Sequence, residues 1–424
     1  MVYKKGDQIL NCYPFSYAFK EEHRDKICDF CFSSVQAKIS RCSKCCVIYY
    51  YGRQCQKSSW METHKHECKF LEMLDSKEPQ ITLLLIVRTL CKLRNDGGYS
   101  KKVSLPNGRS RRFGDLMSHK ENVLMDPKLN KMFFVFLTMI RNKLGGVLET
   151  NESEVLDIFT KISINSASIL NGELLNVGTC LSLEFSSIDH SCRPNALYMF
   201  IGRTLVVQAL CDIANFEDVR VGYIDTTKPR FNRQILLKNK YFFDCNCEEC
   251  TEDPLNLEKL KSHSPCCPQC QNLVDGNRCM NCNKEVDLSR YYQIKEILSV
   301  EEINAKASLL FKDVLKYFHP FDYVAFIYCH HMLRYSYLLT QNEIQILHER
   351  ILLALRKYVY AYDILMPQHL INLMVVLISK NELKSLHSLL FETKTAMDVI
   401  YPKSHSMFDA FNDVCLMYEM ANDK

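Results

Sequence analysis

Cysteine is the residue type whose number and spacing most clearly indicate chemistry in this chain. Sixteen of the 22 cysteines fall into three groups, at residues 28–68, at Cys192 with residues 245–250, and at residues 266–282. Thiolates two residues apart suit a tetrahedral zinc ion better than a disulfide framework. Since no secretory segment follows Met1, we expect a reducing compartment in which clustered thiols bind zinc.

The first group has the composition of a two-zinc module. Its seven candidate ligands are Cys28, Cys31, Cys42, Cys45, Cys55, His64 and Cys68. Bound zinc contributes folding energy directly, which a segment too short for a large core needs. The spacing, with its His-x3-Cys end and Trp60, resembles the MYND zinc finger over residues 28–68. The resemblance implies one complete site, formed by Cys42, Cys45, His64 and Cys68.

The second site of this finger is one ligand short. The family has a cysteine at the position that Tyr51 occupies here, so only Cys28, Cys31 and Cys55 remain. Cys46 is a further thiol, but it adjoins a ligand of the other site. Either a water molecule or Tyr51 completes the second site, or the site is empty.

A second resemblance lies in the middle of the chain. Residues 189–195 read Asp-His-Ser-Cys-Arg-Pro-Asn, and residues 222–225 read Gly-Tyr-Ile-Asp. Together they resemble the SET domain of protein lysine methyltransferases. The later thiols resemble a post-SET zinc site, whose ligands would be Cys192, Cys245, Cys247 and Cys250. A finger near the start of a SET domain, with helices at the end, is the layout of the SMYD family.

The SMYD resemblance implies a protein-lysine N-methyltransferase that uses S-adenosyl-L-methionine and acts as a chromatin regulator. Methyl transfer to a lysine amine needs a neutral amine, a sulfonium carbon about 3 Å away and exclusion of water. Tyrosines can align such an amine, and the family layout gives this catalytic role to Tyr223, with Tyr241 as the channel wall. The implied cofactor-binding residues are Ser186, Asp189, His190, Tyr223, Phe243 and Asn165.

Three departures from the family pattern keep a second hypothesis open. The sequence begins at Met1, after the glycine-containing turn that the family has before residues 5–7, so we expect either a short form of the sequence or a pocket that lacks one wall. Asp189 replaces an asparagine, and an ionised carboxylate cannot donate the hydrogen bond that an amide donates. Residues 112–119 stand where the family has a tyrosine-rich segment. The alternative to an active enzyme is a catalytically weak or inactive SET and MYND scaffold that binds protein partners.

The third cysteine group is interpreted from its spacing alone. Two Cys-x2-Cys pairs flank a turn at residues 275–277, which favours one zinc ion held by Cys267, Cys270, Cys279 and Cys282. Cys266 is then a bystander. Over the three groups, the sequence predicts two to four zinc ions.

The elements that position these groups follow from hydrophobic periodicity. Strand-like composition is found at residues 6–20, 181–185, 204–210 and 219–224, and helical spacing at 70–98, 122–172 and, as six or seven helices, 288–421. We expect an α+β fold in which a β-clip-like SET lobe carries the finger and a helical insert, followed by an all-α tetratricopeptide-like domain. The predicted boundaries are 1–27 (truncated start of the SET lobe), 28–68 (finger), 69–177 (helical linker and insert), 178–225 (core SET), 226–255 (post-SET), 256–286 (knuckles) and 287–424 (helical domain).

Composition limits the remaining functions. No apolar run approaches the roughly 20 residues of a membrane-spanning helix, so no membrane role is expected. A formal net charge of +4 does not favour nucleic acid as the primary partner, and the basic loop at 101–112 is interpreted as solvated. The pair at residues 330–331 is interpreted as packed or exposed histidines. Expected partners are proteins with a target lysine and proline-rich or other peptides on the finger, for a monomer in nucleus and cytoplasm.

Overall fold

The structure is a computed structural model that describes residues 2–33, 39–73, 81–95, 97–144, 151–172, 174–252, 264–299, 305–358 and 362–422. The chain divides into two compact units, each described here by itself. The first unit comprises Met1–His190, Pro194–Tyr223 and Leu236–Asp244, and the second comprises Ser191–Arg193, Ile224–Ile235 and Cys245–Lys424. The expected α+β class is confirmed, and the finer domain boundaries stay predictions.

Small antiparallel sheets form the centre of the first unit. One sheet has the order β1-β11-β10 and the other the order β2-β8-β7, while a short parallel pair joins β12 to β9. The strands are β1 (Gln8–Cys12), β2 (Ser16–Phe19), β7 (Ser166–Leu170), β8 (Asn176–Leu181), β9 (Asp189–His190), β10 (Ala196–Ile201), β11 (Thr204–Ala209) and β12 (Arg220–Val221). Buried side chains from both sheets, such as Ile9, Val177 and Leu205, belong to one core cluster. This shared core fixes the segments that carry the SET-like motif.

The predicted strands are confirmed in part, and elsewhere their predicted extent is wrong. Strand β11 matches the prediction at 204–210. Strand β8 ends at Leu181, and a 3-10 turn, Phe185–Ser187, follows where a strand was expected. The turn forms because the Ser182 hydroxyl accepts a hydrogen bond from the Phe185 amide at 3.2 Å. Strand β12 covers only Arg220–Val221 of the expected 219–224.

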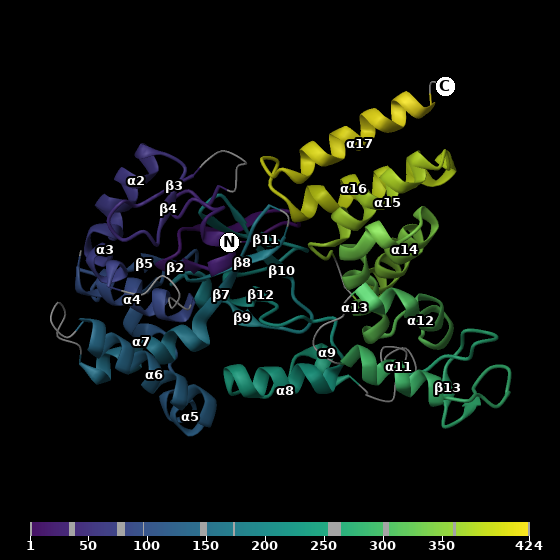
Figure 1. Ribbon diagram of the computed structural model, residues 1–424, viewed down its shortest axis with the longest axis horizontal. Helices are drawn as coiled ribbons and strands as arrows, with labels where there is room; N and C mark the ends of the chain where they lie inside the picture. Colours follow the sequence, from purple (N-terminus) through teal and green to yellow (C-terminus); the bar gives the residue numbers. More distant parts are fainter. Residues whose placement is uncertain are drawn as a thin grey trace. The chain divides into compact units, whose positions relative to one another are not determined.

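Helices cover the rest of the first unit, and Figure 1 shows α2, α3, α4, α6 and α7 at one end of it. Their bounds are α1 (Glu21–Arg24), α2 (Arg53–Ser59), α3 (Lys65–Glu72), α4 (Ile81–Arg94), α5 (Lys120–Met125), α6 (Pro127–Leu144), α7 (Glu152–Asn165) and α8 (Arg230–Tyr241), the last shared between the units. Helix α4 is buried at every position from Leu83 to Cys91. It is therefore the element around which the finger and the sheets pack. The predicted helix at 122–172 gives way to strand β7 after Asn165. Leu74, part of the predicted 70–98 helix, lies outside the described residues.

Short elements complete the finger and the loops. A π-helix, Trp60–His64, joins α2 to α3, so this segment turns more widely than an α-helix before it reaches the ligand His64. The short strands are β3 (Ser40–Arg41), β4 (Tyr49–Tyr50), β5 (Val103–Ser104), β6 (Ser110–Arg111), β13 (Val274–Asp275) and β14 (Arg278–Cys279), and the 3-10 turns outside the C-terminal helices are Phe113–Asp115, Phe185–Ser187 and Phe216–Asp218.

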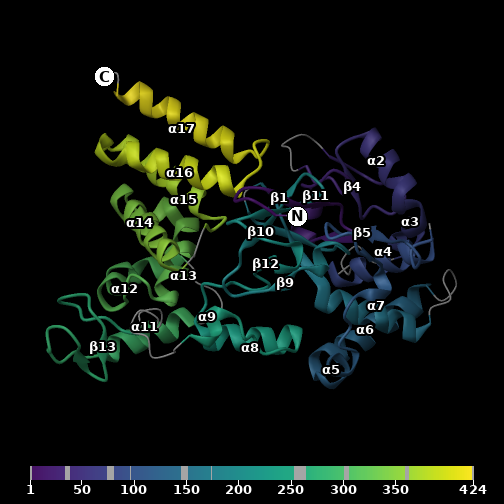
Figure 2. The same ribbon diagram turned by 180° about the vertical axis from the view of Figure 1, so that it is seen from behind.

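The second unit is mainly helical, as the sequence predicts. Within its described residues, seven α-helices follow residue 288. Helix α9 is Glu248–Thr251, and the others are α11 (Ser289–Ser299), α12 (Phe311–Tyr317), α13 (Tyr323–Met332), α14 (Gln341–Tyr358), α15 (Met366–Ser379), α16 (Leu386–Ile400) and α17 (Met407–Asn422). Consecutive helices from α13 to α17 pack against one another, and Figures 1 and 2 show α14 to α17 stacked side by side. Among the described residues, no helix combines the length and the apolar character that a bilayer crossing needs.

Candidate functional site

The same backbone turn occurs four times among the described cysteine pairs. In four of the five Cys-x2-Cys pairs, all but Cys247–Cys250, the residue after the second cysteine has a left-handed backbone, with φ between 57 and 62°. Its amide donates to the carbonyl of the first cysteine at 2.8–3.1 Å. The four left-handed residues are Phe32, Cys46, Gln271 and Asn283. This turn presents both thiols of a pair to one point, which is the geometry a bound ion requires.

The complete finger site has distances that fit a tetrahedral ion. The Cys42 and Cys68 sulfur atoms lie 3.8 Å apart, and the His64 Nε2 lies 3.4 Å from Cys42 Sγ and 3.7 Å from Cys45 Sγ. Ligand atoms at the corners of a tetrahedron around zinc are separated by roughly 3.5–3.8 Å. All four side chains are buried. The predicted ligand set is therefore brought together and could hold zinc.

A buried ionic network holds the histidine of this site in place. His64 Nδ1 contacts Glu67 Oε1 at 3.2 Å, and Arg88 donates to both Glu67 oxygens at 2.7 and 2.8 Å. Arg88 also donates to the Asp29 carboxylate at 3.0 Å and to the Tyr17 carbonyl at 3.0 Å. A carboxylate on the second ring nitrogen fixes the orientation of a metal-binding histidine. Sequence reasoning missed this network, because its charged residues are distant in sequence.

The second finger site gathers only three ligands. The sulfur atoms of Cys28, Cys31 and Cys55 lie within 4.8 Å of one another, and among the described residues no His, Cys, Asp or Glu ligand atom joins them as a fourth. Cys46 is exposed, and its thiol lies 3.9 Å from the Ser43 carbonyl. The three-ligand count that Tyr51 implies is thus what the structure shows.

The two remaining groups each bring four thiols together. Cys192 Sγ lies 3.6 Å from Cys250 Sγ and 4.0 Å from Cys245 Sγ, with Cys247 as the fourth member. The hydrogen bond between Cys250 and Cys192 lowers the pKa of Cys250 to about 5 against the effect of burial, and Arg233 adds to this lowering. A low pKa supplies the thiolate that zinc needs.

In the third group, Cys267 and Cys282 lie 3.7 Å apart, and Cys270 and Cys279 lie 3.4 Å apart. The Cys279 sulfur also accepts two backbone amides, from Asn281 and Cys282, both at 3.4 Å. Amide donors of this kind stabilise a thiolate in place. Cys266 lies outside the ligand group, and its thiol lies 3.5 Å from the Lys316 carbonyl.

The predicted catalytic residues form an aromatic cluster in the first unit. Tyr223 donates its hydroxyl to the Ile188 carbonyl at 2.6 Å, and Tyr241 donates its hydroxyl to the Tyr223 carbonyl at 3.2 Å. The centres of the two tyrosine rings are 5.0 Å apart. The His190 ring lies 5.3 Å from that of Tyr223 and 6.1 Å from that of Phe243. Four of the residues predicted from the family layout therefore meet at one place.

Backbone pairing explains how His190 reaches Tyr223. Strands β9 and β12 run in parallel and pair His190 with Val221, two residues before Tyr223. The Tyr223 amide donates to His190 Nδ1 at 3.0 Å. Since Nδ1 accepts a hydrogen bond, the neutral ring carries its proton on Nε2.

The other predicted cofactor residues have different surroundings. Asp189 is exposed on β9, and Ser186 donates its hydroxyl to the Leu183 carbonyl at 2.9 Å. Asn165 uses its side-chain NH₂ on the Met117 carbonyl at 2.8 Å and the Lys161 carbonyl at 2.7 Å. The two hydrogens of that group are therefore occupied, which leaves the side-chain oxygen for other contacts.

Two further residues at the cluster escaped the sequence analysis. Arg111, interpreted above as part of a solvated loop, is half-buried, and its Nε has no hydrogen-bond partner among the described residues. Burial lowers the pKa of Arg111, while electrostatic interactions with Asp115, Tyr223 and Asp189 counteract this effect. The loop is thus not wholly solvated, because Arg111 is half-buried and lies near enough to Asp189 and Tyr223 to interact with them electrostatically. The sequence shows that the loop is positively charged, but it does not show which of its side chains is turned away from solvent.

Phe242 is the second such residue, and it separates Tyr241 from Phe243. Its φ of 61° is a left-handed conformation that bulky residues rarely adopt, at the end of α8 where glycine is usual. The Phe242 ring packs 5.7 Å from that of His119, another left-handed residue. This backbone turn lets the two neighbouring aromatic residues both contact the cluster. A strained residue beside a candidate site is consistent with a functional constraint.

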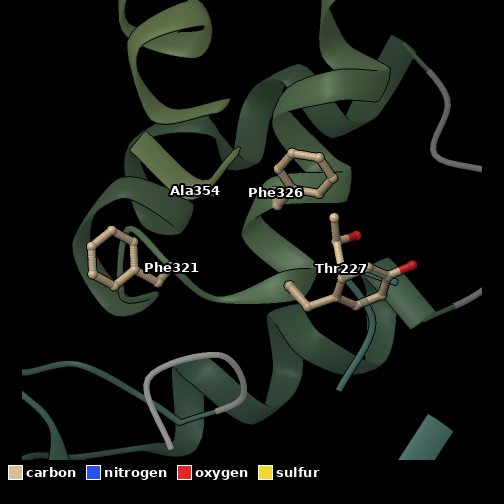
Figure 3. A pocket seen from close by; sticks show the side chains of 5 residues that line it. Thr227, Phe321, Phe326 and Ala354 are labelled. Carbon is tan, nitrogen blue, oxygen red and sulfur yellow. The ribbon is translucent and has the colours of Figure 1, made fainter. Parts of the chain in front are cut away.

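Two features of the second unit complete the description. A small apolar pocket is lined by Thr227, Phe321, Tyr323, Phe326 and Ala354, as Figure 3 shows.

The pair at residues 330–331 has a buried neighbour that the sequence analysis did not foresee, since the His330 ring lies 5.6 Å from the His369 ring. The Nδ1 atoms of His348 and His369 lie 3.1 Å apart, and burial lowers the pKa of His348 to about 4. The sequence analysis expected packed or exposed histidines at 330–331, and both are half-buried.

The site features define a class of protein built from a zinc finger and a small β lobe. These features are three clusters that could each hold zinc, a three-thiol cluster, and a histidine–tyrosine cluster on paired short strands. Curated proteins of this class are similar in sequence. The chain is 29% identical over 260 residues to histone-lysine N-methyltransferase SMYD3 of Homo sapiens, covering 61% of this chain and 59% of that protein. It is 28% identical over 344 residues to N-lysine methyltransferase SMYD2-B of Xenopus laevis, covering 77% and 75%.

A plant protein gives a further match. The chain is 28% identical over 284 residues to histone-lysine N-methyltransferase ASHR1 of Arabidopsis thaliana, covering 66% of this chain and 55% of that protein. The matches to SMYD3 and ASHR1 thus span less than two thirds of those relatives. No family model matches the chain. The similarities to these named methyltransferases support membership of the SMYD family.

Proposed function

We propose that the protein is a protein-lysine N-methyltransferase that uses S-adenosyl-L-methionine and acts on histone or non-histone lysines in nucleus and cytoplasm. The observation that carries this proposal is the pair of hydroxyl hydrogen bonds that fixes Tyr223 on the Ile188 carbonyl and Tyr241 on the Tyr223 carbonyl. Bound S-adenosyl-L-methionine supplies an electrophilic methyl group on a sulfonium. The similarity to named lysine methyltransferases supports the substrate class.

The tyrosine hydrogen bonds suit the alignment of an amine. A phenol that donates to a carbonyl keeps its oxygen lone pairs as acceptors, and the donated bond fixes where they point. Burial, with Asp189 and Tyr241, raises the pKa of Tyr223 well above its usual range. Tyr223 therefore stays a neutral phenol near pH 7 and accepts hydrogen bonds from the amine, while it does not act as the base that deprotonates it.

The cofactor-facing residues also have proposed roles. The proton that His190 carries on Nε2 makes this edge of the ring a donor, while Asp189 offers only acceptor oxygens. Arg111 lies where its charge acts on both Asp189 and Tyr223, so it supplies the donor that a carboxylate at position 189 lacks. Phe243 and Ser186 would line the same pocket. Asn165 acts by holding the Met117 backbone, because its NH₂ hydrogens are already used.

Titration calorimetry with S-adenosyl-L-methionine and radiolabelled methyl transfer to a histone mixture test this proposal on the full zinc-loaded chain. Saturable heat and labelled protein are the expected results. Absence of binding at millimolar cofactor would leave the alternative, a SET and MYND scaffold that binds partners without catalysis. The exposed Asp189 carboxylate is the observation that favours this alternative.

A further inference from the structure

The Cys28–Cys31 pair is built like a metal-binding knuckle although its site has only three thiols. Phe32, which follows the pair, has φ 62°, and its amide donates to the Cys28 carbonyl at 2.9 Å. The two pairs of the knuckle group have the same turn, at Gln271 and Asn283, and there four thiols meet. The turn at Cys28 is thus the one found in the knuckle group, and the two sites differ in their number of ligands.

Neighbouring side chains hold this knuckle in shape. The Phe32 ring packs edge-on against Tyr17 at 4.7 Å and Phe19 at 4.9 Å, both in the buried strand β2. The Arg203 guanidinium lies over the Phe30 ring at 4.4 Å and forms two hydrogen bonds, at 2.8 and 2.9 Å, with the Glu62 carboxylate. A cysteine pair that the surrounding fold already orders does not need the folding energy of a fourth metal bond.

The position of the family's missing ligand is open to solvent. Tyr51 is 50% exposed, and it directly follows strand β4, whose Tyr49 carbonyl accepts the Asp29 amide at 2.8 Å. The chain at Tyr51 therefore runs beside the residue that follows Cys28. Cys31 and Cys55 are themselves partly exposed, so small molecules in solution can approach the thiols. Zinc sites with three protein ligands keep a coordination position for an external ligand.

We propose that Cys28, Cys31 and Cys55 form an open metal site that binds zinc through three thiolates and takes its fourth ligand, a monodentate donor such as water or a small thiol, from solution. Binding releases the three thiol protons to solvent and forms three Zn–S bonds, with no change of oxidation state. The ion is exchangeable, in contrast to those of the three closed sites. This inference concerns metal binding alone and does not depend on methyl transfer.

The test measures zinc content by mass spectrometry of the elements and zinc release to a chromogenic chelator on the full chain. We expect four zinc ions per chain after zinc loading, of which one leaves at least about tenfold faster than the others, since even loss of a supporting residue weakens metal sites by 10–100-fold. The Tyr51→Cys variant restores a fourth thiolate and should move this ion to the slow phase. The Cys55→Ser variant should lose the fast phase and leave the slow phases unchanged.

The Tyr51→Phe and Tyr51→Cys variants together distinguish the possible sources of the fourth ligand. Tyr51→Phe removes the phenol, and we expect it to keep the fast phase of the unsubstituted chain. Faster release from Tyr51→Phe would show that the phenol is a ligand and would overturn the open site. Only three ions per chain, or a single release rate, would also overturn it. Cadmium-113 NMR of the cadmium-loaded chain gives an independent readout: one resonance should move to the four-sulfur range in Tyr51→Cys alone.

Discussion

Replacement of Arg88 by methionine should destabilise the finger and the lobe beneath it by about 3–5 kcal/mol, the cost of breaking a buried ion pair from one side. Arg88 lies on α4, and its guanidinium contacts the Glu67 and Asp29 carboxylates at 2.7–3.0 Å with side chains that are at most 7% exposed. Methionine keeps the length of the side chain but removes the cation from both buried carboxylates and leaves Glu67 with the His64 ring as its partner.

The expected loss of stability follows from the negative charges of Glu67 and Asp29, which Arg88 compensates in the unsubstituted chain. Burial alone would raise the pKa of Glu67, and Arg88 with His64 instead lowers it to about 2. A carboxyl whose folded pKa lies below its unfolded value stabilises the fold above the unfolded pKa, and this contribution is lost as pH falls toward the folded pKa. The Glu67 contribution is therefore complete above about pH 4.5 and lost toward pH 2. Without Arg88, this contribution shrinks.

Trp60 provides the assay, because it is the chain's single tryptophan and its ring lies 5.9 Å from that of His64. Urea unfolding of the zinc-loaded chain, followed by Trp60 fluorescence, reports on the finger. The matched control is Arg141→Met, which breaks a half-exposed pair with Glu152 and should cost at most about 1 kcal/mol. Equal effects of the two substitutions would refute the argument that burial makes the Arg88 network important.

Three other predictions concern the tyrosine cluster, its neighbour Arg111 and the third cysteine group. Tyr223→Phe should lower kcat about tenfold to a hundredfold in a methyl-transfer assay, because an oriented oxygen is lost; wild-type activity would exclude Tyr223 from amine alignment. Arg111→Gln should weaken S-adenosyl-L-methionine binding about tenfold by calorimetry, since Asp189 loses its cation, whereas Arg109→Gln, on an exposed position of the same loop, should bind normally; equal affinities would remove Arg111 from the site. Cys279→Ser should release one zinc ion per chain and leave the others bound, and retention of all the zinc would show that the knuckles hold none.

The cysteine groups were predictable because ligand spacing is a local property of the sequence. Cys267 and Cys270 are close in any structure, and the turn at Gly276 brings Cys279 back to them. The partner of Cys192 lies more than fifty residues away, and only the family resemblance connected the two. The strands at residues 6–20 were predictable for the same local reason, from alternating apolar side chains.

The remaining features depend on tertiary contacts that no local pattern encodes. Arg88 stands among apolar residues of α4, and nothing in the sequence shows that two distant carboxylates meet it. Arg111 appeared as one cation of a basic loop, and only the fold directs it toward Asp189. Position 242 would be expected to hold glycine, and the left-handed phenylalanine found there is tolerated because its ring is packed against His119.

The left-handed residue at the end of α8 has a consequence for how this protein would lose function. Tyr241 and Phe243 face the same cluster only while Phe242 keeps a conformation that costs about 1–3 kcal/mol and that its packed ring sustains. Relaxation of this one residue to an ordinary backbone would rotate both neighbours out of register, while the strand pairing of the sheets does not involve it. Damage at this point would therefore abolish the proposed methyl transfer in a chain that still folds, so screens for stability alone would overlook it.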